Sequence, residues 1–271
     1  MHPKVNILGT HINSINNKDL LNALEQVILQ WRTQVNLSSA VTDTTNGPIN
    51  LKSTTQVCIT PTNSILAARK QPKVQAIYNA SEWVICDGVP VKWAAGFLGT
   101  PIVERITGLD LLPDLIQLSH EKNFSVFLLG ASPGVGEQLK NKIQAEYPNC
   151  IVKGIYVPPF MPVFSESENK KMLEAVNQSD ADILLVSLTA PKQDIWIAEH
   201  KHLLQVPLSI GIGGAFEVMA GLVPRAPKWM HAAGLEWLYR LIQEPKRMYR
   251  RYLIEAPLFI PLIIRQKFSK K

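Results

Sequence analysis

Several polar side chains follow directly after apolar runs of this sequence, where a parallel sheet would present them to a ligand. Asp87 follows the run Trp83–Cys86, Thr60 ends the run at 56–60, and Gln193 lies shortly after the run at 182–188. A carboxylate that is partly desolvated in a crevice has a raised pKa, which suits a general base. Asp is also a favoured helix N-cap, so position alone leaves Asp87 open to either role.

Two glycine-rich turns also follow apolar runs, one at 130–136 and one at 211–214. Backbone N–H groups at the start of a helix can bind phosphate, and glycine lets a ligand approach the backbone closely. The turns lack the G-x-G-x-x-G spacing of nicotinamide dinucleotide sites. Gly130, Gly213 and Gly214 are therefore candidates for contact with a phosphate or nucleotide.

One pair of acids has the D-x-D spacing that holds a metal ion in many sugar-nucleotide enzymes. This pair, Asp180 and Asp182, precedes the apolar run at 182–188 instead of following it. It is therefore expected at the wrong edge of the sheet, as two solvated acids in a turn. The sequence has no other cluster of acids or histidines with metal-ligand spacing. We predict that the protein needs no metal and no cofactor.

Apolar strand-like runs alternate with segments of helical periodicity through residues 1–221. This alternation predicts an α/β fold with a Rossmann-like parallel sheet and helices on both faces, in which ligands bind at the carboxyl ends of the strands. The polar, turn-rich stretch 36–55 is expected to be an inserted loop. Strands are expected at 5–10, 56–60, 82–87, 125–130, 150–156, 182–188 and 207–214, and helices at 17–33, 63–70, 73–79, 90–98, 108–121, 133–146, 165–177 and 191–204.

The remaining residues, 222–271, carry a net charge of +8, whereas residues 1–221 sum to −2. Arg240, Arg247, Arg250 and Arg251 recur at helical intervals, and arginine forks bind phosphate oxygens, although a solvated basic face has the same spacing. The final segment APLFIPLIIRQKF is too short to span a bilayer, and its apolar and basic character is typical of an interfacial segment or of helices packed on the sheet. We expect a helical appendage that contacts an anionic membrane surface.

The sequence contains no run of about 20 apolar residues, which a membrane span requires, and its first residues lack the pattern of a secretory signal. Its three cysteines cannot all pair and lie in or beside apolar runs, as buried thiols of a reducing compartment do. These features predict a cytoplasmic protein.

Six stretches of the chain form a specific combination of motifs: CITPTNSIL, CDGVPVKWAAGFLGTPIVERITGLDLL, VFLLGASPGVGE, APKQDIWI, GIGGAFEVMAGLVPRAPKW and GLEWLYRLIQEPKRMYRRY. In this order they resemble the WecG–TagA–CpsF family of bacterial glycosyltransferases, and the resemblance covers nearly the whole chain apart from 36–55 and the last 15 or so residues. The resemblance implies inverting, metal-independent transfer of N-acetylmannosamine, or a related sugar, from a UDP-sugar donor. The implied acceptor is an undecaprenyl-diphosphate-linked GlcNAc-type lipid of cell-surface polysaccharide synthesis.

The resemblance also implies roles for single residues. Asp87 matches the family's base, which deprotonates the acceptor hydroxyl. The appendage is implied to complete the active site and to bind the inner face of the cell membrane. The chain is implied to form a homo-oligomer through its body. Substrate contacts are implied for Thr60, Thr62, Asn63, Arg105, Gln193 and Glu217 in the body and for Arg240, Arg247 and Arg250 in the appendage.

Two other classes stay open on the residues alone. One is a nicotinamide-dependent oxidoreductase on a similar sheet, which the glycine spacing disfavours. The other is a non-catalytic module that binds a membrane or nucleic acid through the basic tail. That module leaves Asp87 and the glycine turns unexplained, and the apolar side of the tail favours a lipid surface, so we expect no nucleic-acid partner.

Overall fold

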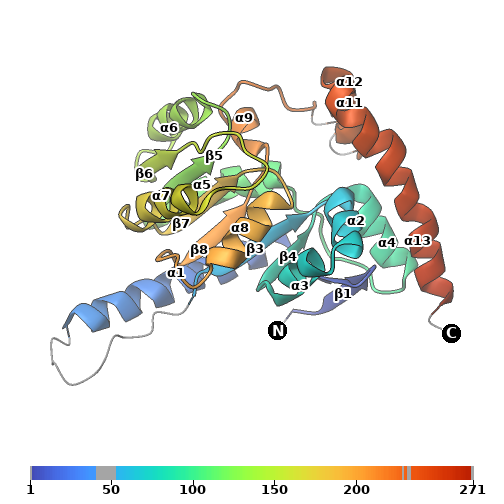
Figure 1. Ribbon diagram of the computed structural model, residues 1–271, viewed down its shortest axis with the longest axis horizontal. Coiled ribbons are helices and arrows are strands. Elements are labelled where there is room, and N and C mark those ends of the chain that lie inside the picture. The colour runs from blue at the N-terminus through green and yellow to red at the C-terminus, as the bar shows by residue number, and fades with distance from the viewer. Residues whose placement is uncertain (1, 41–52, 228, 231–232, 270–271) are drawn as a thin grey trace.

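The computed structural model describes residues 2–40, 53–227, 229–230 and 233–269. Within these residues, eight strands form one sheet in the order β1-β2-β4-β3-β8-β7-β5-β6 at the centre of the molecule (Figure 1). All neighbouring strands pair in parallel except β1 and β2. The predicted α/β fold with a mostly parallel, Rossmann-like sheet is confirmed. The strands are β1 (Lys4–Ile7), β2 (Thr10–Asn13), β3 (Thr55–Thr60), β4 (Trp83–Cys86), β5 (Ser125–Gly130), β6 (Ile151–Tyr156), β7 (Ile183–Ser187) and β8 (Leu208–Gly211).

Helices cover both faces of the sheet because alternate strand residues point to opposite sides. Val57 and Ile59 of β3 pack into one core cluster, and Cys58 between them packs into another. One face is covered by α1 (Asn17–Ala40), α5 (Gly108–Lys122), α6 (Val135–Glu146) and α9 (Ala215–Met219). The other is covered by α2 (Thr62–Lys70), α3 (Pro72–Ala80), α4 (Val89–Phe97), α7 (Glu166–Asn177) and α8 (Lys192–His200).

The strand expected at 5–10 is wrong in its second half, because the chain reverses there into a hairpin. Leu8 and Gly9 have φ angles of 52° and 91°, the pair of positive values that a two-residue hairpin turn of type I′ requires. Ile7 pairs with Thr10 across the turn. The apolar run VNIL gives no sign of this reversal, so the short strand β2 was not predicted.

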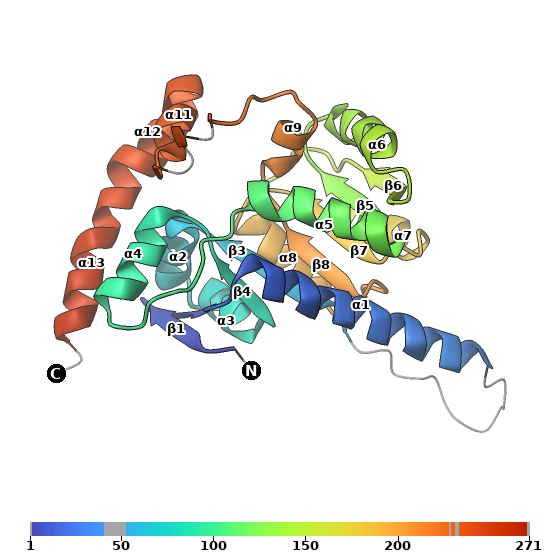
Figure 2. The ribbon, with the colours of Figure 1, turned by 180° about the vertical axis from the view of Figure 1, so that it is seen from behind.

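The expected loop at 36–55 is wrong at both ends. Helix α1 continues to Ala40, so residues 36–40 are helical, and β3 begins at Thr55. The helix extends beyond its predicted end because the first strong helix breakers are Gly47 and Pro48. The rest of the predicted loop, 41–52, lies outside the described residues. In Figure 2, α1 projects past the edge of the sheet.

The appendage is helical, as predicted, and packs back onto the body. It comprises α11 (Glu236–Gln243), α12 (Pro245–Tyr249), a π-helix η1 (Arg250–Glu255) and α13 (Ala256–Phe268). Phe259 and Ile263 of α13 are fully buried in the core cluster that α2, α3 and α4 share. The Gln266 side chain accepts from the Leu8 N–H at 2.8 Å and donates to the Asn6 carbonyl at 2.9 Å. No helix in the described ranges is long and apolar enough to cross a membrane.

The acids at the start of β7 differ from their predicted role. Asp180 is exposed, as expected, but Asp182 is buried and accepts two hydrogen bonds from the Arg32 guanidinium, at 2.7 and 2.8 Å. The same carboxylate also accepts from the Ser125 N–H and hydroxyl, both at 2.7 Å. Asp182 therefore ties α1 to the amino ends of β5 and β7, and is not a solvated turn acid.

Candidate active site

A cavity of about 520 Å³ lies between the carboxyl ends of the central strands and the appendage. Its floor comes from the segments that follow β3, β4, β7 and β8, and its roof comes from α11, η1 and the start of α13. Because β4, β3, β8 and β7 are neighbours in the sheet, the segments that follow them meet at one edge. Eight of the predicted site residues line this cavity: Thr62, Asn63, Asp87, Arg105, Gln193, Gly213, Gly214 and Arg240.

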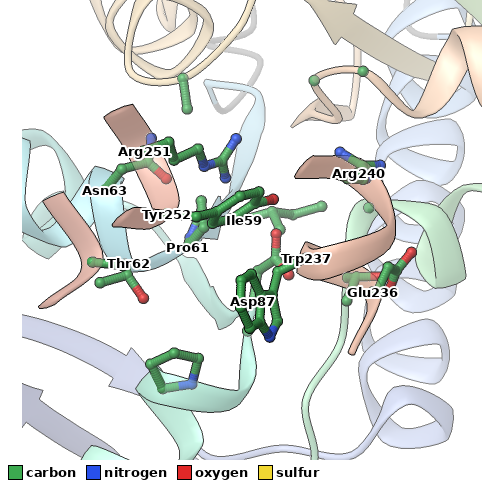
Figure 3. A pocket seen from close by; sticks show the side chains of 18 of the residues that line it. Ile59, Pro61, Thr62, Asn63, Asp87, Glu236, Trp237, Arg240, Arg251 and Tyr252 are labelled. Carbon is green, nitrogen blue, oxygen red and sulfur yellow. The ribbon is translucent and has the colours of Figure 1, made fainter. Parts of the chain in front are cut away.

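Asp87 lies in the wall of the cavity, and Figure 3 shows its carboxylate below the side chains of Arg240 and Arg251. Its backbone N–H donates to the Thr60 carbonyl at 3.3 Å, which fixes the end of β4 against β3. Burial raises the pKa of Asp87 above its ordinary value of 3.8, while the positive charges of Arg251, Arg105 and Arg240 oppose the rise. The net direction is upward, as a general base near neutral pH requires.

Two acids and two arginines connect the roof of the cavity to its floor. Arg105 lies 3.9 Å from a carboxylate oxygen of Glu236 in α11. Arg225 approaches the other Glu236 oxygen at 3.8 Å, forms an ion pair with Asp110, and donates to the Leu109 carbonyl at 3.2 Å. These contacts anchor the start of the appendage to the first turn of α5 and hold Arg105 beside the cavity.

The Gln193 side chain packs closely against the glycine turn that follows β8 and is hydrogen-bonded to it. The Gln193 Oε1 accepts from the Gly213 N–H at 3.1 Å. A Cβ atom at Gly211 would lie only 2.6 Å from the Gln193 amide nitrogen, so any other residue there would displace the Gln193 side chain. Asn63 lines the cavity, and its Oδ1 is buried without a hydrogen-bond partner in the described part of the chain. That oxygen is available to accept from a bound ligand.

Helices that begin at the cavity include α2 at Thr62, α4 at Val89, α5 at Gly108 and α8 at Lys192, beside the lining residue Gln193. The free N–H groups and the positive dipole end of a helix attract anions. Together with Arg105, Arg240 and Arg251, these ends make the cavity suitable for a group with several negative charges, such as a diphosphate.

The structure does not bring every predicted substrate contact to the cavity. Thr60 is fully buried, and its hydroxyl donates to the Ile85 carbonyl at 2.8 Å, so it joins β3 to β4. Gly130 ends β5 with φ 99°, and a Cβ atom there would lie 2.4 Å from the Ser187 carbonyl oxygen. Its glycine therefore serves close packing of β5 against β7. Neither residue is among those that line the cavity, and contact of either with a substrate stays a prediction.

The appendage arginines do not all face the cavity. Arg251 lines the cavity, whereas Arg250 faces outward and lies 3.3 Å from Glu255. The helix breaks at Glu244, beside Pro245, and the chain continues after Tyr249 as a π-helix, whose wider turn changes which arginines face the cavity. The side chain of Arg247 lies outside the described residues.

Glu217 is not among the lining residues, although its Oε2 lies 3.8 Å from where a Cβ of Gly214 would be. Its role in ribose contact stays a prediction.

Three polar or aromatic side chains that line the roof, Glu236, Trp237 and Tyr252, were not predicted as site residues, and Arg251 was predicted only as one of the basic side chains that could bind phosphate. The Trp237 and Tyr252 rings meet edge to face with centroids 5.9 Å apart, and the Arg251 guanidinium lies 5.6 Å from the Tyr252 centroid. Glu236 could have been predicted from the sequence, because it is four residues before Arg240 and therefore on the same side of a helix.

No group of three or more His, Cys, Asp or Glu that could hold a metal ion occurs among the residues that the structure describes. Asp87 and Glu236 are the acids that line the cavity, and arginines face both of them. The absence of a cofactor stays a prediction.

Asp194 follows Gln193 but points into the protein interior. It is fully buried, its Oδ2 accepts from the Tyr78 hydroxyl at 3.0 Å, and its backbone carbonyl accepts from the Gln56 amide at 2.8 Å. Burial raises the pKa of Asp194 from 3.8 to about 7. The folded protein therefore binds a proton here over a pH range in which the unfolded chain has released it.

We expect the stability of the protein to fall as pH rises through this range, because the raised pKa favours the protonated folded state. Between pH 5 and 8 the Asp194 contribution should decrease by roughly 2 to 3 kcal/mol. Asp194→Asn should remove it, since the amide does not ionise. Urea unfolding of both proteins at the two pH values measures the difference, and an equal pH dependence in both would contradict this assignment.

The sheet and the cavity define an α/β enzyme that binds its ligand at the carboxyl ends of parallel strands, under a basic helical roof. The chain belongs to the WecG/TagA/CpsF family of glycosyltransferases, whose model matches residues 28–271. It is therefore a glycosyltransferase, and the oxidoreductase and the non-catalytic module do not describe it.

Named relatives support this class. The chain is 30% identical over 205 residues to an N-acetylglucosaminyldiphosphoundecaprenol N-acetyl-beta-D-mannosaminyltransferase of Bacillus subtilis, covering 76% of this chain and 77% of the relative. Proteins of the same name from Bacillus spizizenii and Staphylococcus aureus are 26% and 29% identical, covering 74% and 70% of this chain and 75% and 72% of the relatives.

Proposed function

We propose that the protein transfers N-acetylmannosamine, or a related sugar, from a UDP-sugar to a GlcNAc-type sugar linked by diphosphate to undecaprenol. The names of its relatives give this sugar and this acceptor. The observation that carries the proposal is the position of Asp87 in a cavity with three arginines, between the strand ends and the appendage. That arrangement combines a base with groups that stabilise a negatively charged leaving group.

In the proposed reaction, Asp87 accepts the proton of the acceptor hydroxyl as its oxygen attacks the anomeric carbon. The bond from that carbon to the UDP oxygen breaks, and attack from the opposite side inverts an α-linked donor to the β product named in the relatives. Arg105, Arg240 and Arg251, with the helix starts at the cavity, stabilise the charge that develops on the departing diphosphate. This set of groups supports a reaction without a metal ion.

The acceptor is a membrane lipid, so we infer that the enzyme works at the inner face of the cell membrane as a peripheral protein. The basic appendage supports this location, because cationic segments bind anionic lipid surfaces. Self-association of the chain is part of the same proposal and is not needed to complete the cavity.

The proposal is tested by incubating the full chain with UDP-N-acetylmannosamine and a GlcNAc-diphosphate lipid in buffer containing EDTA. Mass spectrometry is expected to find the acceptor enlarged by one N-acetylhexosamine. UDP-glucose and UDP-glucuronate serve as matched donors and are expected to react more slowly. If only another donor reacts, the sugar is wrong. If product appears only after a divalent cation is restored, the metal-independent mechanism is wrong.

A further inference from the structure

A row of apolar side chains is exposed along helix α4, directly beside the cavity. Val89, Trp93 and Phe97 are four residues apart and therefore lie on one side of the helix. Their exposed fractions are 45%, 47% and 36%, and the Trp93 and Phe97 rings stack with centroids 5.4 Å apart. The opposite side of α4 is buried in the core, so this row is not needed to hold the helix in place.

Helix α13 continues the same surface on the other side of the cavity mouth. Ile260 and Ile264 are 48% and 43% exposed, on a different side of the helix from the buried Phe259 and Ile263. Lys267 extends this row by a further turn, and its ammonium lies 5.8 Å from the Phe97 ring centroid. Val89 and Ile260 both line the cavity, so the two rows meet at its edge. Both views show α13 running alongside α4 (Figures 1 and 2).

The positive charge of this surface favours an anionic bilayer over a second copy of the chain as its binding partner. Helices α4 and α13 contain no acid, and together they hold three basic residues: Lys92, Arg265 and Lys267. An acid-free surface with exposed aromatic and aliphatic side chains fits the interface of an anionic bilayer, where Trp rings, aliphatic chains and Lys find favourable partners. A second copy of this surface would bring like charges together.

We propose that the α4–α13 surface, formed by Val89, Trp93, Phe97, Ile260, Ile264 and Lys267, docks the enzyme on an anionic bilayer with the cavity mouth toward the lipid. This inference rests on the proposed function for its lipid-linked acceptor. It extends the membrane contact from the appendage to the catalytic body, because α4 belongs to residues 1–221. The acceptor then enters the cavity from the bilayer without leaving it.

The test compares two double variants of the full chain in sedimentation with vesicles of phosphatidylcholine and phosphatidylglycerol in equal amounts. Trp93→Ser/Phe97→Ser is expected to lower the partition coefficient roughly tenfold, since two aromatic rings lose their contact with lipid. Phe160→Ser/Val163→Ser is the matched control. These residues are 104% and 81% exposed, in the loop that joins β6 to α7, and they belong to neither helix of the proposed surface. The control is expected to bind like the natural chain.

Each other outcome overturns the proposal. Equal losses in both variants would show that binding follows general exposed hydrophobicity, and unchanged binding in the α4 variant would exclude α4. A change of molar mass in light scattering, with vesicle binding intact, would assign the surface to self-association. Circular dichroism checks that both variants fold. Because no sugar donor is present, a negative result here is separate from a failure to form product in the transferase assay.

Discussion

Asp87→Asn is expected to lower kcat by roughly a hundredfold to ten-thousandfold, the range that loss of a general base produces. The amide has nearly the size of the carboxylate but cannot accept a proton from the acceptor hydroxyl. Asp87 lies in the cavity wall with three arginines, and so the amide is expected to leave the cavity and the fold intact. Initial rates of product formation at saturating donor and acceptor measure the effect.

The pH dependence of kcat/KM shows whether Asp87 acts as a general base or has only a structural role. In the natural protein, kcat/KM should fall at low pH with an apparent pKa above 3.8, because the base must be ionised and burial raises its pKa. This limb should disappear in the Asn variant. Asp180→Asn, at an exposed acid before β7, is the control and should retain full rate. If Asp87→Asn keeps more than about a tenth of the kcat of the natural protein, a group other than Asp87 is the general base.

Arg251→Ala is expected to lower kcat by roughly a hundredfold to a thousandfold, whereas Arg250→Ala should change it by less than about twofold. Arg251 lines the cavity and its charge acts on Asp87, while Arg250 pairs with Glu255 on the outer side of η1. The two residues are adjacent and chemically identical, so the pair controls for lost charge in the appendage. Steady-state kinetics and direct UDP binding are the measurements.

Arg251→Lys refines this comparison, since it keeps the charge but loses the planar fork that binds two phosphate oxygens. An intermediate rate is expected. If the alanine variants at 250 and 251 lose equal activity, or if the order is reversed, the register of η1 assigned here is incorrect. If Arg251→Ala weakens only membrane binding, its charge acts on lipid and not on the leaving group.

The floor of the cavity was predictable because it depends on short-range rules. A residue that follows a parallel strand lies at the ligand-binding edge, and Asp87, Gln193 and Gly213 obey this rule. Gly130 also follows a strand, but β5 is separated from β8 by β7, so its turn lies away from the cavity. Strand order depends on long-range packing, which apolar periodicity along one chain does not contain.

The roof was harder to predict because its geometry is irregular. Pro245 in the sequence predicts a break between two helices, but the π-helix from Arg250, which changes which side chains face inward, has no such signal. Trp237 of α11 and Tyr252 of η1, which are 15 positions apart in the sequence, form an aromatic pair that joins the two helices. Such pairs form when the helices dock, so local propensity does not show them.

Helix α4 begins only two residues after Asp87, with Gly88 between them. If its exposed row rests on the bilayer, the chain itself fixes the height of the reactive carboxylate above the headgroups. The helix is about 13 Å long at 1.5 Å per residue, and Asp87 precedes its first turn. An acceptor sugar separated from its hydrocarbon anchor by only a diphosphate is then within reach, whereas a sugar on a long spacer would be held too far from the surface. The enzyme would then select acceptors by the length of the group that joins the sugar to its lipid.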